Sequence, residues 1–390
     1  RTLNGNRKEF TGRNRSQTAF VKDSLWKEGD ILTQPELAET LKRIRDKGRD
    51  GFYSGPTAEM IVREMKRGFG LISARDLAEY RAVWREPLEG EYRGHRIITM
   101  NLPSGGGVTL LQILSMLEDH DLGKMGFNIP ETIHLVTEAE RRAFADRSFH
   151  LGDPGFVFVP VDKLLSKSYL AWRMASFDKS KASSSSEVRH GRPDRLEPEE
   201  TTHYSAADRE GNAVAVTTTL NDTFGSSIVV DGAGFLLNNE MDDFSIKPGY
   251  PNMYGLIGGF ANSIRPGKRM LSSMTPTIVE KGGTLFMITG SPGGSTIPSS
   301  VLHSILNVID FGMNIQEAVE APRYHHQWMP DYISYETNAF DSLVISKLEG
   351  AGHKLRRRGA IGRVNAVIVL PDGSYQAGAD PRGDNAAAGY

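Results

Sequence analysis

Cysteine does not occur in this chain of 390 residues. Its absence excludes a thiol nucleophile, a disulfide and a thiolate metal site. It leaves the redox compartment open, because a cysteine-free chain is stable in either. Covalent catalysis, if the protein performs any, has to use another residue.

Long hydrophobic runs and an excess of one charge are missing as well. The apolar runs are short, as at 235–237 and 366–370, whereas a membrane-spanning helix needs about 18 residues. The 46 basic and 48 acidic side chains give a formal net charge of -2, which is not the electrostatic footprint of a nucleic-acid-binding protein. The composition therefore favours small molecules as partners.

An initiating methionine and an apolar signal core are missing at the start. The chain opens at Arg1 in a polar, basic stretch, so we expect a truncated or processed beginning. Its length still exceeds one ordinary domain of roughly 100–200 residues and predicts two or three structural units or one large one. With 39% hydrophobic and 24% charged residues, the composition is that of an ordinary folded protein.

Helical signals dominate the first half. One helix is expected to begin near Thr33 and to end at Gly48, with Leu37, Leu41 and Ile44 as its buried stripe. The further elements expected here are a helix after Pro56 that buries Met60, Ile61 and Met65, a helix capped by Ser73 and Asp76, a strand at 91–100, a helix at 108–117 and a helix at about 131–149.

A polar, serine-rich stretch at 178–200 separates the two halves. It has almost no apolar anchors, so we expect an exposed, mobile connector. The pattern then becomes β, with a hairpin of 202–208 and 213–220. The further elements expected in the second half are strand cores at 278–279 and 285–288, a helix at 297–311 and a buried strand at 364–370.

The abrupt junction between Glu200 and Thr201 suggests a cleavage site. A threonine hydroxyl is a weak nucleophile, and the α-amino group of the same residue can activate it only if the preceding peptide bond is cut. Such an amine has a pKa of about 7.7–8.0 and can act as a general base near neutral pH. Periodicity alone favours a simpler interpretation, in which Thr201 and Thr202 are β-branched residues that start a strand.

Short motifs throughout the chain decide between these interpretations. The second half contains T-T-H-Y-S at 201–205, T-L-N at 219–221, L-L-N-N-E-M-D-D-F at 236–244, L-S-S-M-T-P at 271–276 and G-S-P-G-G-S at 290–295. The other motifs are W-K-E-G-D at 26–30, F-Y-S-G at 52–55, A-D-R-S-F-H-L-G-D-P at 145–154, H-H-Q-W at 325–328 and A-D-P-R at 379–382. In order and spacing they resemble the γ-glutamyltransferase family, whose members are also called glutathione hydrolases.

The resemblance implies an α+β fold, the N-terminal-nucleophile hydrolase sandwich with four layers in the order αββα. It also implies a precursor that cleaves itself between Glu200 and Thr201, through attack of the Thr201 hydroxyl on the Glu200 carbonyl and hydrolysis of the resulting ester. Residues 1–200 would then be the C-terminal portion of the large-subunit region, ending in the flexible linker 178–200. Residues 201–390 would be the small, catalytic subunit region.

The same resemblance implies the catalytic groups. Thr201 would be the nucleophile, and Thr219 would orient its hydroxyl. Gly293 and Gly294 would form an oxyanion hole, in which two backbone N–H groups face the oxygen that becomes negative during the attack. Glycine suits such a position because it takes unusual backbone angles and adds no bulk.

The substrate contacts follow in the same way. Asn221, Glu240 and Asp243 would bind the α-amino end of a γ-glutamyl group, since carboxylates near an ammonium form charge-assisted hydrogen bonds. Ser272 and Ser273 would bind its α-carboxylate. By residue type alone, these positions would be a turn with capping carboxylates and two loop serines.

A lid is implied over this pocket. Residues 248–258 resemble the family's lid loop, with Tyr254 as the covering aromatic, and their glycine and proline content fits a mobile segment. His325 and His326 suggest a metal site at first sight, but they lack partners at ligand spacing and we expect them to be structural. The sequence predicts no metal and no cofactor.

One departure from the family concerns the region before the nucleophile. Family members have a longer stretch there, including an arginine that pairs with the substrate α-carboxylate. Only 200 residues precede Thr201, and nothing before Trp26 matches that arginine's motif. We therefore expect the N-terminal portion of the sandwich to be truncated, so that full activity needs the absent segment.

The activity implied is cleavage of the γ-glutamyl bond of glutathione and related amides through a Thr201 ester, with transfer to water or to an amino-acid or peptide amine. Its partners would be these small molecules and the two subunits of one precursor, in the periplasm or outside the cell. Two alternatives remain, a cephalosporin or glutaryl acylase of the same superfamily and an inactive truncated binding module. Asp243 disfavours the acylase, because members that accept substrates without the α-amine tend to lose this acid.

Overall fold

The computed structural model describes residues 2–188 and 201–389, which form two compact units. The first unit comprises residues 1–85 and 222–239, and the second comprises residues 86–221 and 240–390. The predicted site residues all fall within the sequence ranges of the second unit, although Glu200 lies outside the described residues.

The first unit consists of helices and a looped segment. Phe10, Phe20 and Val229 form one small core, and Ile61 and Val230 belong to another. Its helices are α1 (Thr2–Gly5), α2 (Arg7–Arg13), α3 (Pro35–Lys47), α4 (Asp50–Tyr53), α5 (Gly55–Gly68) and α6 (Ala74–Glu79).

Three of these helices were predicted from capping and glycine signals. Helix α3 begins at Pro35, shortly after the start expected near Thr33, and is followed by Gly48 as predicted. The predicted capping box of Ser73 and Asp76 opens α6. The stripe predicted for α3 is partly wrong, because Leu41 is 55% exposed. The buried residue is Thr40, whose hydroxyl donates to the carbonyl of Ala233 over 2.8 Å.

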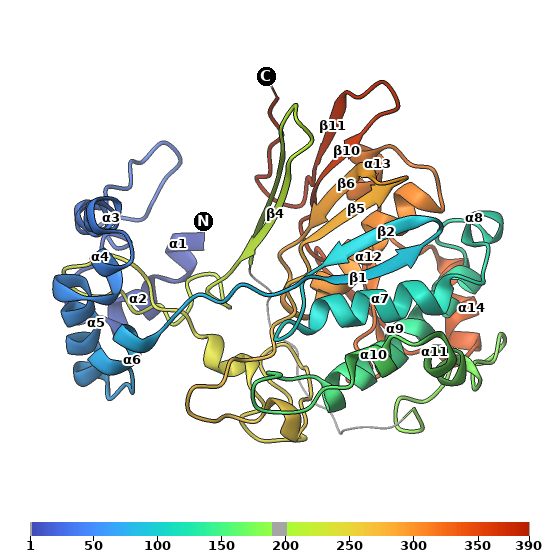
Figure 1. The fold of residues 1–390 in the computed structure, drawn as a ribbon, viewed down its shortest axis with the longest axis horizontal. Helices are drawn as coiled ribbons and strands as arrows, with labels where there is room; N and C mark the ends of the chain where they lie inside the picture. Colours follow the sequence, from blue (N-terminus) through green and yellow to red (C-terminus); the bar gives the residue numbers. More distant parts are fainter. Residues whose placement is uncertain (1, 189–200, 390) are drawn as a thin grey trace. The chain divides into compact units, whose positions relative to one another are not determined.

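A six-stranded antiparallel sheet is the centre of the second unit (Figure 1). Its strand order is β1-β2-β5-β6-β10-β11, and each neighbouring pair is antiparallel. The strands are β1 (Leu88–Tyr92), β2 (His95–Thr99), β5 (Thr277–Lys281), β6 (Thr284–Gly290), β10 (Asn365–Val369) and β11 (Tyr375–Ala379). The predicted strands at 278–279, 285–288 and 364–370 are confirmed.

The single strand predicted at 91–100 is wrong, because this stretch is part of a hairpin. Strands β1 and β2 are joined at Arg93 and Gly94, which have φ angles of 51° and 72°. Two successive residues with positive φ make the turn that suits the twist of a two-stranded ribbon. The turn was not predicted because its first position is occupied by arginine and not by the asparagine, aspartate or glycine that is usual there.

Two helices cover the sheet, α7 (Gly105–Leu117) and α12 (Ile297–Ile309). Helix α7 contacts β1, α12 contacts β6, and the two helices contact each other. Helix α9 (Pro130–His150) packs against α7, and almost its whole length is buried. The three predicted helices at 108–117, 131–149 and 297–311 are therefore confirmed, apart from small shifts at their ends. Further helices are α8 (Leu122–Met125), α10 (Val161–Leu164), α11 (Lys167–Met174), α13 (Ile315–Glu320) and α14 (Ser342–Gly350).

The predicted hairpin after the connector is also present, as β3 (Thr202–Ala207) and β4 (Ala213–Thr218). It packs against β6 and β10, where the side chain of Asn365 donates to the carbonyl of His203 over 2.9 Å. The second unit thus contains a helical layer, the six-stranded sheet and a hairpin packed on that sheet. The predicted α+β class is confirmed.

A smaller sheet follows the order β7-β8-β9, with β7 (Tyr324–His325), β8 (Ile333–Glu336) and β9 (Leu355–Arg358). Short 3-10 turns are η1 (Glu240–Asp243), η2 (Phe260–Asn262) and η3 (Gly294–Thr296). Among the described residues, none of the helices has both the length and the apolar composition needed to cross a membrane.

The connector predicted at 178–200 is described only up to residue 188. In that part the prediction of full exposure is wrong, because Ser185 is completely buried. Its backbone N–H donates to Asp331 over 2.9 Å, and its carbonyl accepts from the indole N–H of Trp328 over 2.9 Å. A serine whose backbone groups are all paired can be buried without apolar neighbours in sequence.

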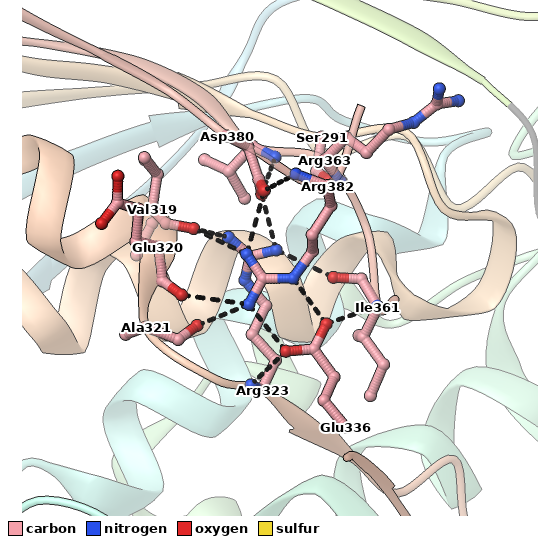
Figure 2. A network of polar contacts seen from close by, with 12 residues as sticks. Ser291, Val319, Glu320, Ala321, Arg323, Glu336, Ile361, Arg363, Asp380 and Arg382 are labelled. Atoms are coloured by element: carbon pink, nitrogen blue, oxygen red, sulfur yellow. Dashed lines mark hydrogen bonds and ion pairs between the residues drawn. The ribbon is translucent and has the colours of Figure 1, made fainter. Parts of the chain in front are cut away.

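A buried ion network joins the end of the chain to β8 (Figure 2). Arg382 binds Glu336 over 2.6 Å and Asp380 over 2.9 Å, and Arg323, which is 1% exposed, binds Asp380 over 2.8 Å. Burial alone would raise the pKa of Asp380, but the two guanidinium groups hold it below its ordinary value. The carboxylate therefore stays charged at neutral pH.

Replacing Asp380 by alanine should lower the free energy of unfolding by about 3 kcal/mol, because it leaves buried guanidinium charge without its counterion. Denaturant unfolding at pH 7 measures this. Glu89→Ala is the control, since Glu89 pairs with Arg96 on the surface, where an ion pair contributes less than about 1 kcal/mol. Equal small losses in both variants would contradict a stabilising role for the network.

Candidate active site

The hydroxyls of Thr201 and Thr219 lie together at one end of the β3–β4 hairpin. Thr202 is paired with Thr218, so the residue before β3 and the residue after β4 are neighbours. Thr201 Oγ1 donates to Thr219 Oγ1 over 3.3 Å. The separation of 18 residues therefore follows from the register of the hairpin. The other residue of the predicted cleavage site, Glu200, is outside the described part of the chain.

Asn221 continues the site from Thr219. Its backbone N–H donates to Thr219 Oγ1 over 2.8 Å, and it is only 3% exposed. Its φ angle of 76° is left-handed, a conformation that asparagine adopts more readily than most residues. The Asn221 carbonyl accepts the phenol O–H of Tyr254 over 2.6 Å.

Tyr254 lies in the predicted lid, residues 248–258, which folds back on itself. The N–H of Gly249 donates to the carbonyl of Gly258, and the Asn252 side chain accepts from two backbone N–H groups of the same loop. Tyr254 is 5% exposed, and its ring lies against Gly294. A Cβ atom at Gly294 would come within 2.6 Å of that ring.

Gly293 and Gly294 occupy the turn between β6 and α12. Their φ angles are 140° and 51°, which favour glycine. Gly293 precedes η3, Gly294 is the first residue of η3, and α12 follows directly. The first N–H groups of a helix have no partner within the helix. Contacts therefore run from Thr201 through Thr219, Asn221 and Tyr254 to this turn.

Carboxylates gather in η1. Burial raises the pKa of Glu240 to about 7. The pKa of Asp243 rises to about 8, chiefly through burial and also through the negative charges of Glu240 and Asp242, while Arg147 opposes the rise. Carboxyl groups with such raised pKa values are typical of functional sites.

Ser272 and Ser273 are buried beside Arg147 of α9. Arg147 Nη2 donates to Ser273 Oγ over 2.8 Å and contacts the carbonyl of Ser272 over 3.4 Å. Burial lowers the pKa of Arg147 to about 10, and Asp243 opposes that change. Ser272 Oγ donates to Ser104 Oγ over 2.8 Å.

Arg147 thus lies beside the serine pair and interacts electrostatically with Asp243 of the acidic turn, although no role was predicted for it from the sequence. It lies within the 145–154 motif, and a charged residue in the middle of a helix with buried neighbours is a signal that could have identified it. All predicted site residues except Glu200 are therefore placed, and Arg147 is added to them.

The two adjacent histidines are buried in hydrogen-bonded positions. His325 is 2% exposed and contacts Ser299 and Gln327, while His326 contacts Asp331. Burial lowers the pKa of His325 to about 3 and that of His326 to about 4, so both are neutral at pH 7.

One other group among the described residues has metal-ligand geometry, namely His134, Glu138 and His353, whose ligand atoms lie within 4.8 Å of one another. Glu138 is already paired with the buried Arg141 over 3.2 Å and with Arg142 over 2.5 Å. Two neighbouring guanidinium charges oppose a cation at this point. We therefore assign no ion to this group.

Two hollows of about 620 and 650 Å³ in the second unit lie elsewhere. One is lined by Glu89, Arg96 and Glu280 at the β1–β2 and β5–β6 turns, and the other by Tyr169 and Trp172 of α11 together with residues of α9. Neither is lined by Thr201. The candidate active site is therefore identified by the types and contacts of its residues and not by the volume of a cavity.

Comparison with known proteins gives one family. The family model described as gamma-glutamyltranspeptidase matches residues 1–390. The chain is 48% identical over 365 residues to the glutathione hydrolase proenzyme of Escherichia coli (strain K12), covering 93% of this chain and 63% of that protein. It is 38% identical over 357 residues to the acylase ACY 1 proenzyme of Pseudomonas sp. (strain SE83), covering 91% of this chain and 61% of that protein.

A solved structure has the same fold. The cephalosporin acylase from Bacillus halodurans matches with a TM-score of 0.84 and 25% identity, over 100% of this chain and 70% of that one. The chain spans about three fifths of the length of the curated relatives named above. With a family model that matches from end to end, this chain belongs to the γ-glutamyltranspeptidase family.

Proposed function

We propose that this protein is a γ-glutamyl transferase and hydrolase that uses Thr201 as its nucleophile after cleavage of the Glu200–Thr201 bond. The observation that carries the proposal is the 3.3 Å contact between the Thr201 and Thr219 hydroxyls, with the Asn221 N–H directed at the second. The word proenzyme in the names of the relatives supports processing into two subunits.

Thr219 orients the nucleophile in such a reaction. Its Oγ1 accepts a hydrogen bond from the Asn221 N–H, which fixes the position of this oxygen. The same oxygen accepts from the Thr201 hydroxyl and so orients it. The free α-amine of a cleaved Thr201 then takes the hydroxyl proton, and the oxygen attacks the γ-carbonyl of the substrate. The backbone N–H groups of Gly293 and Gly294 stabilise the negative oxygen that forms.

The second half of the reaction follows from the first. The protonated α-amine returns its proton to the departing amine, which leaves a γ-glutamyl ester on Thr201. Water or an acceptor amine then attacks this ester by the same steps, so the kinetics are ping-pong. Glutathione and related γ-glutamyl amides are the proposed donors, and amino acids or peptides the proposed acceptors.

Charge selects the donor. Asp243 and Glu240 have raised pKa values, so an ammonium group beside them restores the favourable ionised state. Ser272 and Ser273 hold the α-carboxylate by hydrogen bonds, and Arg147 supports them. The acidic pair favours γ-glutamyl over glutaryl donors, because a glutaryl group keeps the carboxylate but lacks the ammonium. It therefore favours the transferase over the acylase. The periplasmic or extracellular location implied by the resemblance belongs to the same proposal.

Thr201→Ala should abolish both self-cleavage and turnover. The parent protein should give two bands on a denaturing gel, the smaller with Thr201 as its first residue. The variant should stay as one band and lose γ-glutamyl-anilide turnover by at least about 1,000-fold. Thr202→Ala is the matched control, because this threonine is exposed and should still permit cleavage.

An uncleaved parent that nevertheless turns over the anilide would contradict the proposal. A cleaved parent that prefers glutaryl-anilide would favour the acylase. A folded parent that binds γ-glutamyl compounds without cleavage or turnover would identify the inactive binding module.

The KM for a γ-glutamyl-anilide should fall as the pH rises from 6 to 8. Below its pKa of about 8, Asp243 is a neutral acid and cannot pair with the ammonium, so each pH unit costs up to roughly tenfold in affinity. Glutaryl-anilide lacks the ammonium and is the matched control, since its KM should not follow this titration. A KM for the γ-glutamyl donor that is independent of pH would be inconsistent with this assignment.

Arg147→Met should move the same titration of KM upward by about one pH unit, because an opposite charge that holds the pKa of Asp243 down has been removed. Arg147→Lys should restore most of the original midpoint. Arg142→Met removes another buried arginine of α9, one that pairs with Glu138, and should lower stability without moving the midpoint. Equal shifts in both methionine variants would show a general effect of destabilisation instead.

A further inference from the structure

Gln327 is buried between two parts of the candidate active site. Its side-chain oxygen accepts from Ser295 Oγ over 2.7 Å, and its Nε2 donates to the carbonyl of Tyr254 over 2.9 Å. Ser295 directly follows Gly294, and the Tyr254 ring lies against Gly294. One amide group thus binds both the glycine turn and the aromatic residue that covers it.

The orientation of this amide is set by its neighbours. Nε2 faces the carbonyls of Tyr254 and Met329, which can only accept hydrogen bonds. A flipped amide would direct its oxygen at both carbonyls. The side-chain oxygen therefore lies toward Ser295 Oγ and toward His325 Nε2 at 2.9 Å, so that this ring nitrogen carries the proton.

His325 extends the support into the interior. With Nε2 protonated in the neutral ring, its Nδ1 is an acceptor and faces Ser299 Oγ at 2.7 Å. Ser299 is fully buried in α12, the helix that the glycine turn precedes. The Gln327 amide is therefore fixed in place by a chain of hydrogen bonds that begins in a rigid helix.

The glycine turn needs such support more than an ordinary turn does. Gly293 and Gly294 have φ angles of 140° and 51°, and glycine has more backbone freedom than any other residue. An oxyanion hole works only if its N–H groups are already aimed before the charge develops. The hydrogen bond between Ser295 and Gln327 restrains the turn from outside and can keep these N–H groups in one orientation.

We propose that Gln327 is a positioning residue that holds the oxyanion turn and the lid aromatic in one arrangement, and that this arrangement sets the rate of acyl transfer. The proposal rests on the proposed function for its kinetic consequence. Its structural consequence, the joint ordering of residues 252–258 and 293–296, does not depend on activity.

Gln327→Met tests both consequences, because methionine has a similar volume but cannot form these two hydrogen bonds. The kcat for γ-glutamyl-anilide should fall at least tenfold, while KM changes less than threefold. In hydrogen–deuterium exchange, peptides that contain 252–258 and 293–296 should both exchange faster than in the parent.

Gln112→Met is the matched control. Gln112 is also a buried amide, in α7, and it donates to Asp146 and to the carbonyl of Leu164, each over 3.1 Å. This variant should lose comparable thermal stability, yet keep kcat within twofold and leave both peptides protected. If the control affects kcat and the two peptides as strongly as Gln327→Met, the effect is one of stability and the proposal is wrong.

Gln327→Glu separates the two bonds. A carboxylate still accepts from Ser295 but donates to Tyr254 only when it is protonated, so its kcat relative to the parent should recover as the pH falls. Unchanged protection of both segments in Gln327→Met would overturn the proposal whether or not the parent is active. An inactive parent whose two segments loosen together in that variant would instead count against the proposed function alone.

Discussion

The register of the β3–β4 hairpin is the constraint on which the candidate active site depends. Pairing of Thr202 with Thr218 brings together two hydroxyls that are 18 residues apart. A shift by one residue would turn every side chain of a strand to the other face, and Thr219 would no longer meet Thr201. The contact of His203 with Gly290 in β6, where a Cβ atom would come within 2.1 Å of the ring, ties this register to the main sheet.

Charge pairing in α9 is the second condition. This helix is buried on nearly all sides, yet it carries ionisable residues, and a buried charge is tolerated only with a partner. Glu138 pairs with arginines of its own helix, and Asp146 with Arg173. Arg147 faces the serines and Asp243 instead. The helix therefore supplies a cation to the site from a position that packing keeps rigid.

Much of this could be predicted from the sequence, for reasons that differ between elements. Helices α3, α6 and α9 and the hairpin were found because proline, capping residues and periodicity are local signals. The turn at Arg93 and the burial of Ser185 were missed, because both residues bind partners distant in sequence, Asp310 and Asp331 respectively. Motif order predicted the candidate site residues, but it could not reveal which of them lie in contact.

The contacts of Tyr254 explain why no role was predicted for Gln327, although this residue lies within the 325–328 motif. The phenol reaches the Asn221 carbonyl, the ring excludes any side chain from Gly294, and the backbone carbonyl receives the Gln327 amide. Two of these contacts use backbone carbonyls, that of Asn221 and that of Tyr254 itself. Every residue has a backbone carbonyl, so such contacts cannot be predicted from residue type. A side chain that binds such backbone atoms, as Gln327 does, is identified only from the folded structure. The candidate site thus combines motif residues whose type indicates a reaction with two others, Arg147 and Gln327, whose contacts become visible only in the packing of α9 and of the segment after β7.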